Sequence, residues 1–325
     1  MLLYMIVRFR IWTMLVAYAA KESYVTRRLS RSVIFIGVIV ALFLLATTIP
    51  LAQAKNDQAP GLKRHELRFN EIEVHEERQG IWRFEEYIQI SPELGLPPGS
   101  FYKVNVYAIK TSDGIVLVDC GVESLYEELM KEINNKFNKK PIVAVLLTHG
   151  HADHAGAGHY FVEAGVPVYA PAGDAGIILM GMQIPGVPIP TDFTYTGYMP
   201  TVLLLGGETL FGLKVIPTPG HSPGSVSYVN EKIGALFSGD TTICYPDEDM
   251  AAEDMTYYME FMTLLMMDKD SIQMQLDSLN ALLDLTDHHG IKTIFPGHNS
   301  SYKGRDVREY IQNSIDVVTQ VLMTK

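Results

Sequence analysis

The chain has 325 residues, of which 47% are hydrophobic, and this composition supports a sizeable core and excludes a disordered protein. Its formal net charge is −11; residues 1–54 contribute +5, from six Lys and Arg against one Glu, which leaves −16 for the rest. Such an acidic body argues against nucleic acid as a partner.

The first 54 residues are organised as a targeting segment rather than as part of a folded domain. Three arginines precede an apolar run over residues 33–51, which ends in Ala52-Gln53-Ala54. A basic flank, an apolar stretch and a small-x-small site are typical of a secretory signal peptide, and the run is also long enough for a membrane anchor. We therefore predict export to the periplasm or the medium, with cleavage after Ala54 or with anchoring through residues 33–54.

After a polar stretch at residues 55–79, short apolar runs alternate with helical patterns. A hairpin is predicted around Ser112-Asp113-Gly114, with strands at residues 105–110 and 115–119. Residues 124–137 have helical spacing, and the apolar, β-branched run at residues 142–147 predicts a strand buried on both faces. Further strands are predicted at residues 166–170, 213–217, 225–229, 233–238 and 292–295, and helices at residues 271–286 and 305–322. This alternation predicts an α/β or α+β fold.

The two cysteines, Cys120 and Cys244, are too few for a disulfide framework or a thiolate-rich structural zinc site. Each lies close in sequence to a residue that we assign below to a metal site. We expect two small buried thiols, and a single disulfide between them is the alternative in an oxidising compartment.

The densest group of potential ligands directly follows the predicted strand at residues 142–147. The run Thr148-His149-Gly150-His151-Ala152-Asp153-His154 places four such side chains within six residues. In an extended segment His149 and His151 point to the same side, and Asp153 and His154 follow where the chain turns toward a helix. Crowding so many ionisable groups is costly unless a cation compensates them, so this run can serve two neighbouring metal ions.

Three further residues follow apolar strands and stand beside glycine: His221, Asp240 and His298. Together with the first run they give five imidazoles and two carboxylates, a nitrogen and oxygen set typical of catalytic zinc that also accepts manganese, iron or cobalt. Isolated histidines are more often structural, and the sequence assigns four of them to that class: His75, His159, His288 and His289.

The order and spacing of these seven residues resemble the metallo-β-lactamase superfamily, over residues 102–302. The resemblance implies a four-layer αββα sandwich, with residues 55–101 as a lead-in and edge of the fold and residues 102–325 as the catalytic domain. It also implies two Zn²⁺ ions per chain: His149, His151 and His221 bind the first, Asp153, His154 and His298 bind the second, and Asp240 bridges both. Asp119 matches an aspartate that orients metal ligands in this family.

The same resemblance implies a hydrolase that opens an ester, thioester or lactone bond of a small molecule with a metal-bound hydroxide. Asp153 and Asp240 are the expected catalytic carboxylates. An aspartate at the position of Asp240 implies a closer resemblance to glyoxalase II-like thioesterases and lactonases than to β-lactamases. The alternatives are a β-lactamase, an iron-dependent redox enzyme, a nuclease and a binding protein on the same scaffold. The acidic chain argues against the nuclease, and the complete ligand set against the redox and binding roles.

Substrate selection is expected from segments between the ligands. Residues 180–200 are irregular and predict a loop over the metals. Residues 255–267 carry five methionines at helical spacing, which favours a core or dimer-contact face over a substrate wall and leaves a homodimer open. Tyr195, Tyr198 and Tyr245 could donate to a substrate oxygen, although packed tyrosines are the more common case. A membrane contact is expected only through the N-terminal segment.

Overall fold

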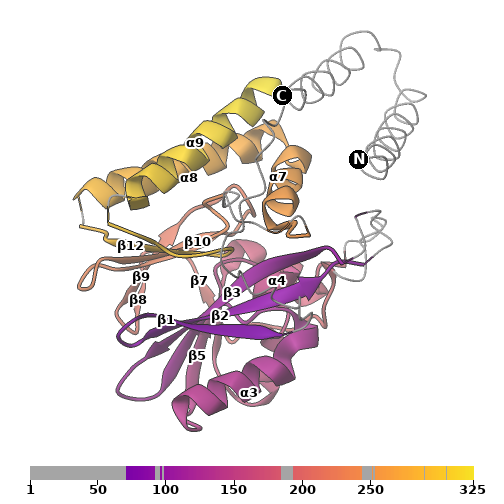
Figure 1. The fold of residues 1–325 in the computed structure, drawn as a ribbon, viewed down its shortest axis with the longest axis vertical. Helices are drawn as coiled ribbons and strands as arrows, with labels where there is room; N and C mark the ends of the chain where they lie inside the picture. Colours follow the sequence, from indigo (N-terminus) through magenta and orange to yellow (C-terminus); the bar gives the residue numbers. More distant parts are fainter. Residues whose placement is uncertain are drawn as a thin grey trace, which may run out of the picture. The chain divides into compact units, whose positions relative to one another are not determined.

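The computed structural model describes residues 71–91, 96, 99–183, 193–243, 251, 253–288, 290–304 and 306–325 (Figure 1). The predicted targeting segment, Cys244 and Tyr245 lie outside these residues. Most of the described chain forms one compact unit, made of Arg68–Ser91 and Gly99–Lys325. No helix in the described ranges is long and apolar enough to cross a membrane.

A seven-stranded sheet has the strands in chain order. It consists of β1 (Ile72–Arg78), β2 (Ile81–Gln89), β3 (Phe101–Lys110), β4 (Ile115–Val118), β5 (Ile142–Leu146), β6 (Val168–Pro171) and β7 (Val202–Leu204). The pairs from β1 to β4 are antiparallel and those from β4 to β7 are parallel. The parallel part brings the carboxyl ends of β4 and β5 to the same edge.

A six-stranded sheet has the order β13-β12-β11-β10-β9-β8. Its strands are β8 (Thr209–Leu210), β9 (Leu213–Pro217), β10 (Val226–Asn230), β11 (Ala235–Gly239), β12 (Thr293–Pro296) and β13 (Tyr302–Lys303). Since β9 and β11 both run antiparallel to β10 and β12 runs parallel to β11, the carboxyl ends of β9, β11 and β12 share one edge.

The helices accompany the two sheets. They are η2 (Glu123–Leu125), α3 (Tyr126–Phe137), α4 (Ala152–Ala155), α5 (Gly158–Glu163), η3 (Ala172–Asp174), α6 (Ala175–Met180), α7 (Thr256–Met266), α8 (Lys269–His288) and α9 (Asp306–Thr324). In Figure 1, α3 covers the outer face of the seven-stranded sheet, and α8 and α9 cover the outer face of the other.

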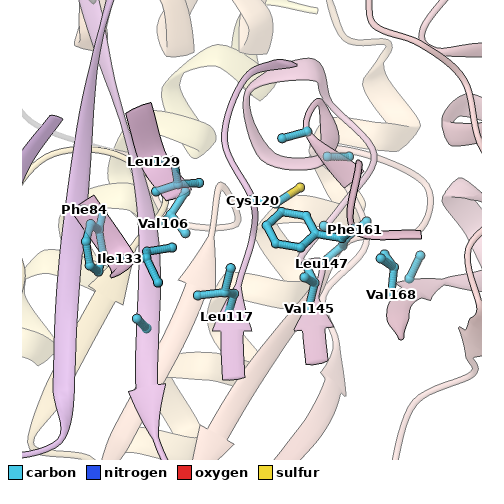
Figure 2. Close-up of a cluster of buried hydrophobic side chains, with 14 of the residues drawn as sticks. Phe84, Val106, Leu117, Cys120, Leu129, Ile133, Val145, Leu147, Phe161 and Val168 are labelled. Carbon is cyan, nitrogen blue, oxygen red and sulfur yellow. The ribbon is translucent and has the colours of Figure 1, made fainter. Parts of the chain in front are cut away.

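Three apolar clusters lie between four layers, and side-chain alternation along the strands builds them. On β5, Val145 packs with residues of α3 and α5, whereas Leu146 lies between the two sheets. On β11, Leu236 packs with residues of α8 and α9, whereas Phe237 lies between the sheets. Figure 2 shows the first cluster, with Leu129 of α3 among the strand side chains. The expected four-layer αββα fold is confirmed.

The strands β1 and β2 were not predicted, because their sequence is rich in charge. Arg83 of β2 is buried and pairs with Glu77 at 2.7 Å and with Glu85 at 2.5 Å. This ionic cluster replaces the apolar alternation by which a strand is recognised. The predicted hairpin strand at residues 105–110 in fact begins at Phe101, so β3 is ten residues long. Cys120 is buried, as expected, and the alternative disulfide with Cys244 stays a prediction because Cys244 lies outside the described residues.

Candidate metal centre

All seven predicted ligands meet where the two sheets present their carboxyl ends. The run from His149 to His154 follows β5, and His221, Asp240 and His298 follow β9, β11 and β12. Gly239, at the end of β11, has a φ of +50°, and a Cβ there would lie 2.7 Å from the Thr148 side chain. Only glycine allows this turn at such close approach to the neighbouring loop, so it fixes where Asp240 emerges.

His149, His151 and His221 form one group, and their ligand nitrogens all lie within 4.8 Å of one another. The closest pair is His221 Nε2 and His151 Nδ1, at 2.8 Å. Nitrogens bound to one tetrahedral zinc ion are about 3.3 Å apart, a value between the closest distance in this group and its 4.8 Å limit.

Asp153, His154 and His298 form a second group within the same limit. Asp153 Oδ2 lies 3.8 Å from His154 Nε2 and 3.8 Å from His298 Nε2. The donors are two imidazoles and one carboxylate, a set that suits zinc and also manganese, iron or cobalt.

Asp240 lies between the two groups and contacts both. One oxygen, Oδ2, is 3.4 Å from His221 Nε2 and 3.8 Å from His149 Nε2. The carboxylate also lies 3.3 Å from His154 Nε2, through Oδ1, and 3.1 Å from His298 Nε2. A single carboxylate thus faces a nitrogen set on either side, which is the arrangement that a bridging ligand requires.

Among the described residues, three buried ligand atoms of the cluster lack the hydrogen bonds that would satisfy them. His149 Nε2, His154 Nε2 and Asp240 Oδ1 are buried and have no hydrogen-bond partner within the part of the chain that the structure describes. Leaving such groups buried and unsatisfied costs about 1–3 kcal/mol each, and more when they are charged. Metal coordination would satisfy all three at once.

Hydrogen bonds to the other ring nitrogens fix the tautomers of three histidines. His154 Nδ1 donates to the Asp119 carboxylate at 2.9 Å, and His298 Nδ1 donates to the Lys103 carbonyl. Thr148 Oγ1 uses its proton on Asp119, so His149 Nδ1 must donate to that hydroxyl, at 3.0 Å. In each ring Nε2 is therefore the nitrogen that faces the site of a metal ion.

Asp119 has the position that the sequence assigned to it, beside the ligands rather than among them. It follows β4 with a φ of +62°, and its Oδ1 accepts the Thr148 N–H at 2.7 Å. Through Thr148 and His154 this one carboxylate orients rings of both groups. A left-handed backbone at a non-glycine residue is uncommon, and Asp and Asn adopt it most readily.

Burial and neighbouring charges shift the pKa values of the predicted ligands. Burial lowers the pKa of His149 well below its ordinary value and that of His221 to about 3. Burial also opposes protonation of His298, yet Asp240 and neighbouring carboxylates raise its pKa to about 10. Burial would raise the pKa of Asp240, but His154 and His298 hold it well below the usual range. The carboxylates therefore require cationic partners, which a divalent ion supplies.

Sequence reasoning missed Asp174, a fully buried residue that joins two ligand-bearing loops. Its Oδ2 accepts the Gly150 N–H at 2.8 Å and the Ser222 hydroxyl at 2.6 Å, and its Oδ1 accepts the Gly224 N–H at 2.7 Å. Gly150 adjoins His149 and His151, and Ser222 follows His221. The preceding Gly173 packs tightly against the loop after His221, since a Cβ there would lie 2.7 Å from the Cα of Gly224.

Tyr195 and Tyr198 are packed in the fold, which is the more common case for a tyrosine. Tyr195 donates to the Gly150 carbonyl and Tyr198 to the Ala155 carbonyl, both at 2.8 Å, and both side chains are buried. Tyr245, His289 and residues 184–192 of the expected loop lie outside the described residues. His159 is buried beside Glu123, at 3.5 Å, and His288 lies beside Asp284, at 3.3 Å.

The predicted helix at residues 255–267 is present as α7, but its methionines do not form its buried face. That face consists of Thr256, Glu260 and Leu264, and Met266 is 75% exposed. Tyr257, Phe261 and Met267 pack only partly against the cluster under α8 and α9. The charged member of this face, Glu260, was not predicted.

Comparison with known proteins agrees with this geometry. The family described as "Metallo-beta-lactamase superfamily" matches residues 99–298. The chain is 32% identical over 143 residues to "Probable metallo-hydrolase YybB" of Bacillus subtilis (strain 168), covering 43% of this chain and 62% of that protein. It is 37% identical over 106 residues to "Hydroxyacylglutathione hydrolase" of Gloeobacter violaceus, covering 31% of this chain and 34% of that protein. Each match thus spans less than two-thirds of the relative.

A solved structure supports the fold over a larger part of the chain. The mono-zinc form of the metallo-beta-lactamase FIM-1 from Pseudomonas aeruginosa aligns with a TM-score of 0.57 and 16% identity, covering 78% of this chain and 97% of that one. At this identity the likeness concerns the fold alone. The family match covers the strands from β3 to β12 and all seven predicted ligands, and the chain belongs to the metallo-beta-lactamase superfamily.

Proposed function

We propose that the protein is a binuclear metal-dependent hydrolase that opens an ester, thioester or lactone bond of a small molecule. The position of Asp240 carries this proposal, because its carboxylate contacts His221 and His149 on one side and His154 and His298 on the other. Structural zinc sites are closed sets of four ligands, whereas seven ligands around one carboxylate suit two ions with open positions.

The chain's own groups divide the work of hydrolysis. A bound pair of divalent ions would supply a water of lowered pKa and polarise the substrate carbonyl. The Asp153 side chain is 18% exposed, against 6% for Asp240, so Asp153 reaches the open side of the centre. There it can accept a hydrogen bond from the attacking water and orient it, while the buried Asp240 holds the two ligand groups together.

Asp240 also supports the substrate class. By family resemblance a bridging aspartate accompanies thioesterases and lactonases more than β-lactamases, and the match to a hydroxyacylglutathione hydrolase agrees with this. We propose zinc as the metal, with manganese, iron or cobalt as alternatives, and β-lactam hydrolysis as the alternative reaction. An iron-dependent redox reaction is a further alternative. A homodimer also remains a proposal.

The test pairs metal analysis of the purified protein with turnover of an acyl-homoserine lactone, a glutathione thioester, an aryl ester and a β-lactam. About two ions per chain, and chelator-sensitive turnover of one of the first three, are expected. His298→Ala should lower this turnover more than about 100-fold, since even residues that only orient ligands are worth about 10- to 100-fold. His288→Ala, at an exposed histidine, is the control.

Other results of this experiment would replace the proposal. One iron ion per chain without hydrolysis would point to a redox enzyme. Turnover of the β-lactam alone would assign the chain to the antibiotic-degrading members of the family.

We further propose that the protein is exported, on the basis of the apolar run at residues 33–51 and Ala52-Gln53-Ala54. Fractionation of the producing cells, with N-terminal sequencing of the recovered protein, tests this. A periplasmic or secreted chain that begins near Lys55, or a membrane-bound full-length chain, agrees with the proposal. An uncleaved protein in the cytosol contradicts it.

A further inference from the structure

The helix α7 carries its only charged side chain on its buried face. Glu260 is 9% exposed and lies in a buried stripe with Thr256 and Leu264, whereas Met266 is 75% exposed and Leu265 is 36% exposed. A surface helix ordinarily buries its apolar residues and exposes its charges. Because a buried carboxylate is costly unless it is paired or coordinates a metal, this reversal indicates a specific partner.

The Glu260 carboxylate is directed at the second ligand group. Its Oε1 lies 3.8 Å from His298 Nε2, the atom that the Lys103 contact leaves for a metal ion. Glu260 forms a third group with Asp240 and His298. Each of the three residues offers one ligand atom, and these atoms lie within 4.8 Å of one another, as in the two groups described above. Two atoms bound to one ion at about 2.0–2.2 Å are at most about 4.4 Å apart, so the 3.8 Å separation fits joint coordination.

The strand β3 holds α7 and His298 in register with each other. Lys103 N–H donates to Thr256 Oγ1 at 3.0 Å, and Lys103 Nζ pairs with the buried Asp254 at 2.8 Å. The Lys103 carbonyl accepts the hydrogen bond from His298 Nδ1. One residue thus fixes the start of the helix that carries Glu260 and the ring that Glu260 faces, as in a preorganised site.

We propose that Glu260 is a further carboxylate ligand of the second metal ion, in addition to Asp153, His154, Asp240 and His298. This inference rests on the proposed binuclear centre. A third carboxylate offsets more of the charge of two divalent ions and therefore strengthens binding of the second ion. The competing explanation is an ion pair between Glu260 and His298 that only stabilises the fold.

The test is a zinc titration of metal-free full-length protein against a chromogenic chelator, for the wild type and Glu260→Gln. The variant keeps the shape of the side chain and removes its charge. We expect the weaker of the two zinc affinities to fall about 10- to 100-fold and the tighter one to stay within twofold. Glu309→Gln, which removes the same charge from an exposed position on α9, should change neither affinity.

Thermal unfolding with and without zinc separates a ligand from an ion-pair partner. For a ligand, Glu260→Gln should shrink the zinc-induced rise in Tm. For an ion pair, the variant should lower the metal-free Tm and leave the zinc-induced rise intact. The second pattern overturns the proposal even if the titration is ambiguous.

The failure of this inference differs from the failure of the proposed function. If the wild type binds two zinc ions and Glu260→Gln binds both with unchanged affinities, Glu260 is not a ligand and the binuclear centre still holds. A wild type that binds only one ion would overturn both, because no second ion would then exist for Glu260 to bind.

Discussion

Ser222 donates its hydroxyl to Asp174 at 2.6 Å, and through this contact one buried carboxylate ties together two loops that carry ligands. Both oxygens of Asp174 accept a backbone N–H, one from Gly150 and the other from Gly224. In Asp174→Asn the amide NH₂ replaces one of these oxygens, so one backbone N–H faces a donor instead of an acceptor. We predict a loss of about 10- to 100-fold in zinc affinity at the group of His149, His151 and His221. Chelator competition measures this loss.

The matched control for this variant is Asp113→Asn in the exposed hairpin turn, which should leave zinc affinity unchanged. Equal zinc affinities for Asp174→Asn and the wild type would show that the loops keep their positions without the carboxylate.

Asp119 is predicted to control the second ion through the tautomer of His154. In Asp119→Asn the side chain no longer accepts all three of its hydrogen bonds, so the N–H of the His154 ring loses its fixed acceptor. We expect zinc content to fall toward one ion per chain while the fold persists, because Asn also tolerates a φ of +62°. Asp119→Ala should in addition lower the Tm, and equal Tm values for the two variants would refute the backbone argument.

Glu86 makes stability depend on pH. It is fully buried, and burial raises its pKa to about 8, while its Oε2 accepts the Val122 N–H at 3.0 Å. The folded state therefore holds a proton that the unfolded chain releases near its ordinary pKa. The contribution of Glu86 to the free energy of unfolding is fully present below about pH 4.5 and is lost as pH rises through about 8. The loss amounts to about 5 kcal/mol at most.

Glu86→Gln removes this titration and keeps a carbonyl acceptor for Val122. Urea unfolding at several pH values should show the wild type losing stability relative to the variant between pH 5 and pH 9. Parallel pH profiles would mean that Glu86 is ionised in the folded protein. Glu309→Gln, at an exposed position, should run parallel to the wild type.

The apolar layer under α8 and α9 is predicted to stabilise the fold independently of the metal centre. Leu282 is fully buried there, and Leu282→Ala should cost about 2–5 kcal/mol of unfolding free energy. Met323→Ala, at a residue that is 80% exposed, should cost less than about 0.5 kcal/mol. Denaturant unfolding measures both, and equal costs would contradict the described packing.

The strands that lead to the ligands were predictable because both of their faces are apolar. The runs ending near His149 and His298 pack one face against helices and the other against the second sheet, so they read as continuous hydrophobic segments. In contrast, β1 and β2 use the buried pair of Arg83 and Glu85, and no local pattern distinguishes such a pair from a solvated charge.

The supporting residues of the centre could not be predicted for a related reason. Asp174 and Glu260 lie 20 residues or more from the His149–His154 run and act through contacts that only the tertiary fold creates. Glu260 stands among methionines and aromatic residues at helical spacing, a pattern that predicts a core face. The fold instead directs its carboxylate toward His298.

The most direct test of the binuclear centre is the anomalous difference map of a zinc-loaded crystal of the protein. The account predicts two zinc peaks about 3.5–4 Å apart with the Asp240 carboxylate between them, one beside His221 and the other beside His298. A single peak at His149, His151 and His221, with Asp240 turned away, would contradict it.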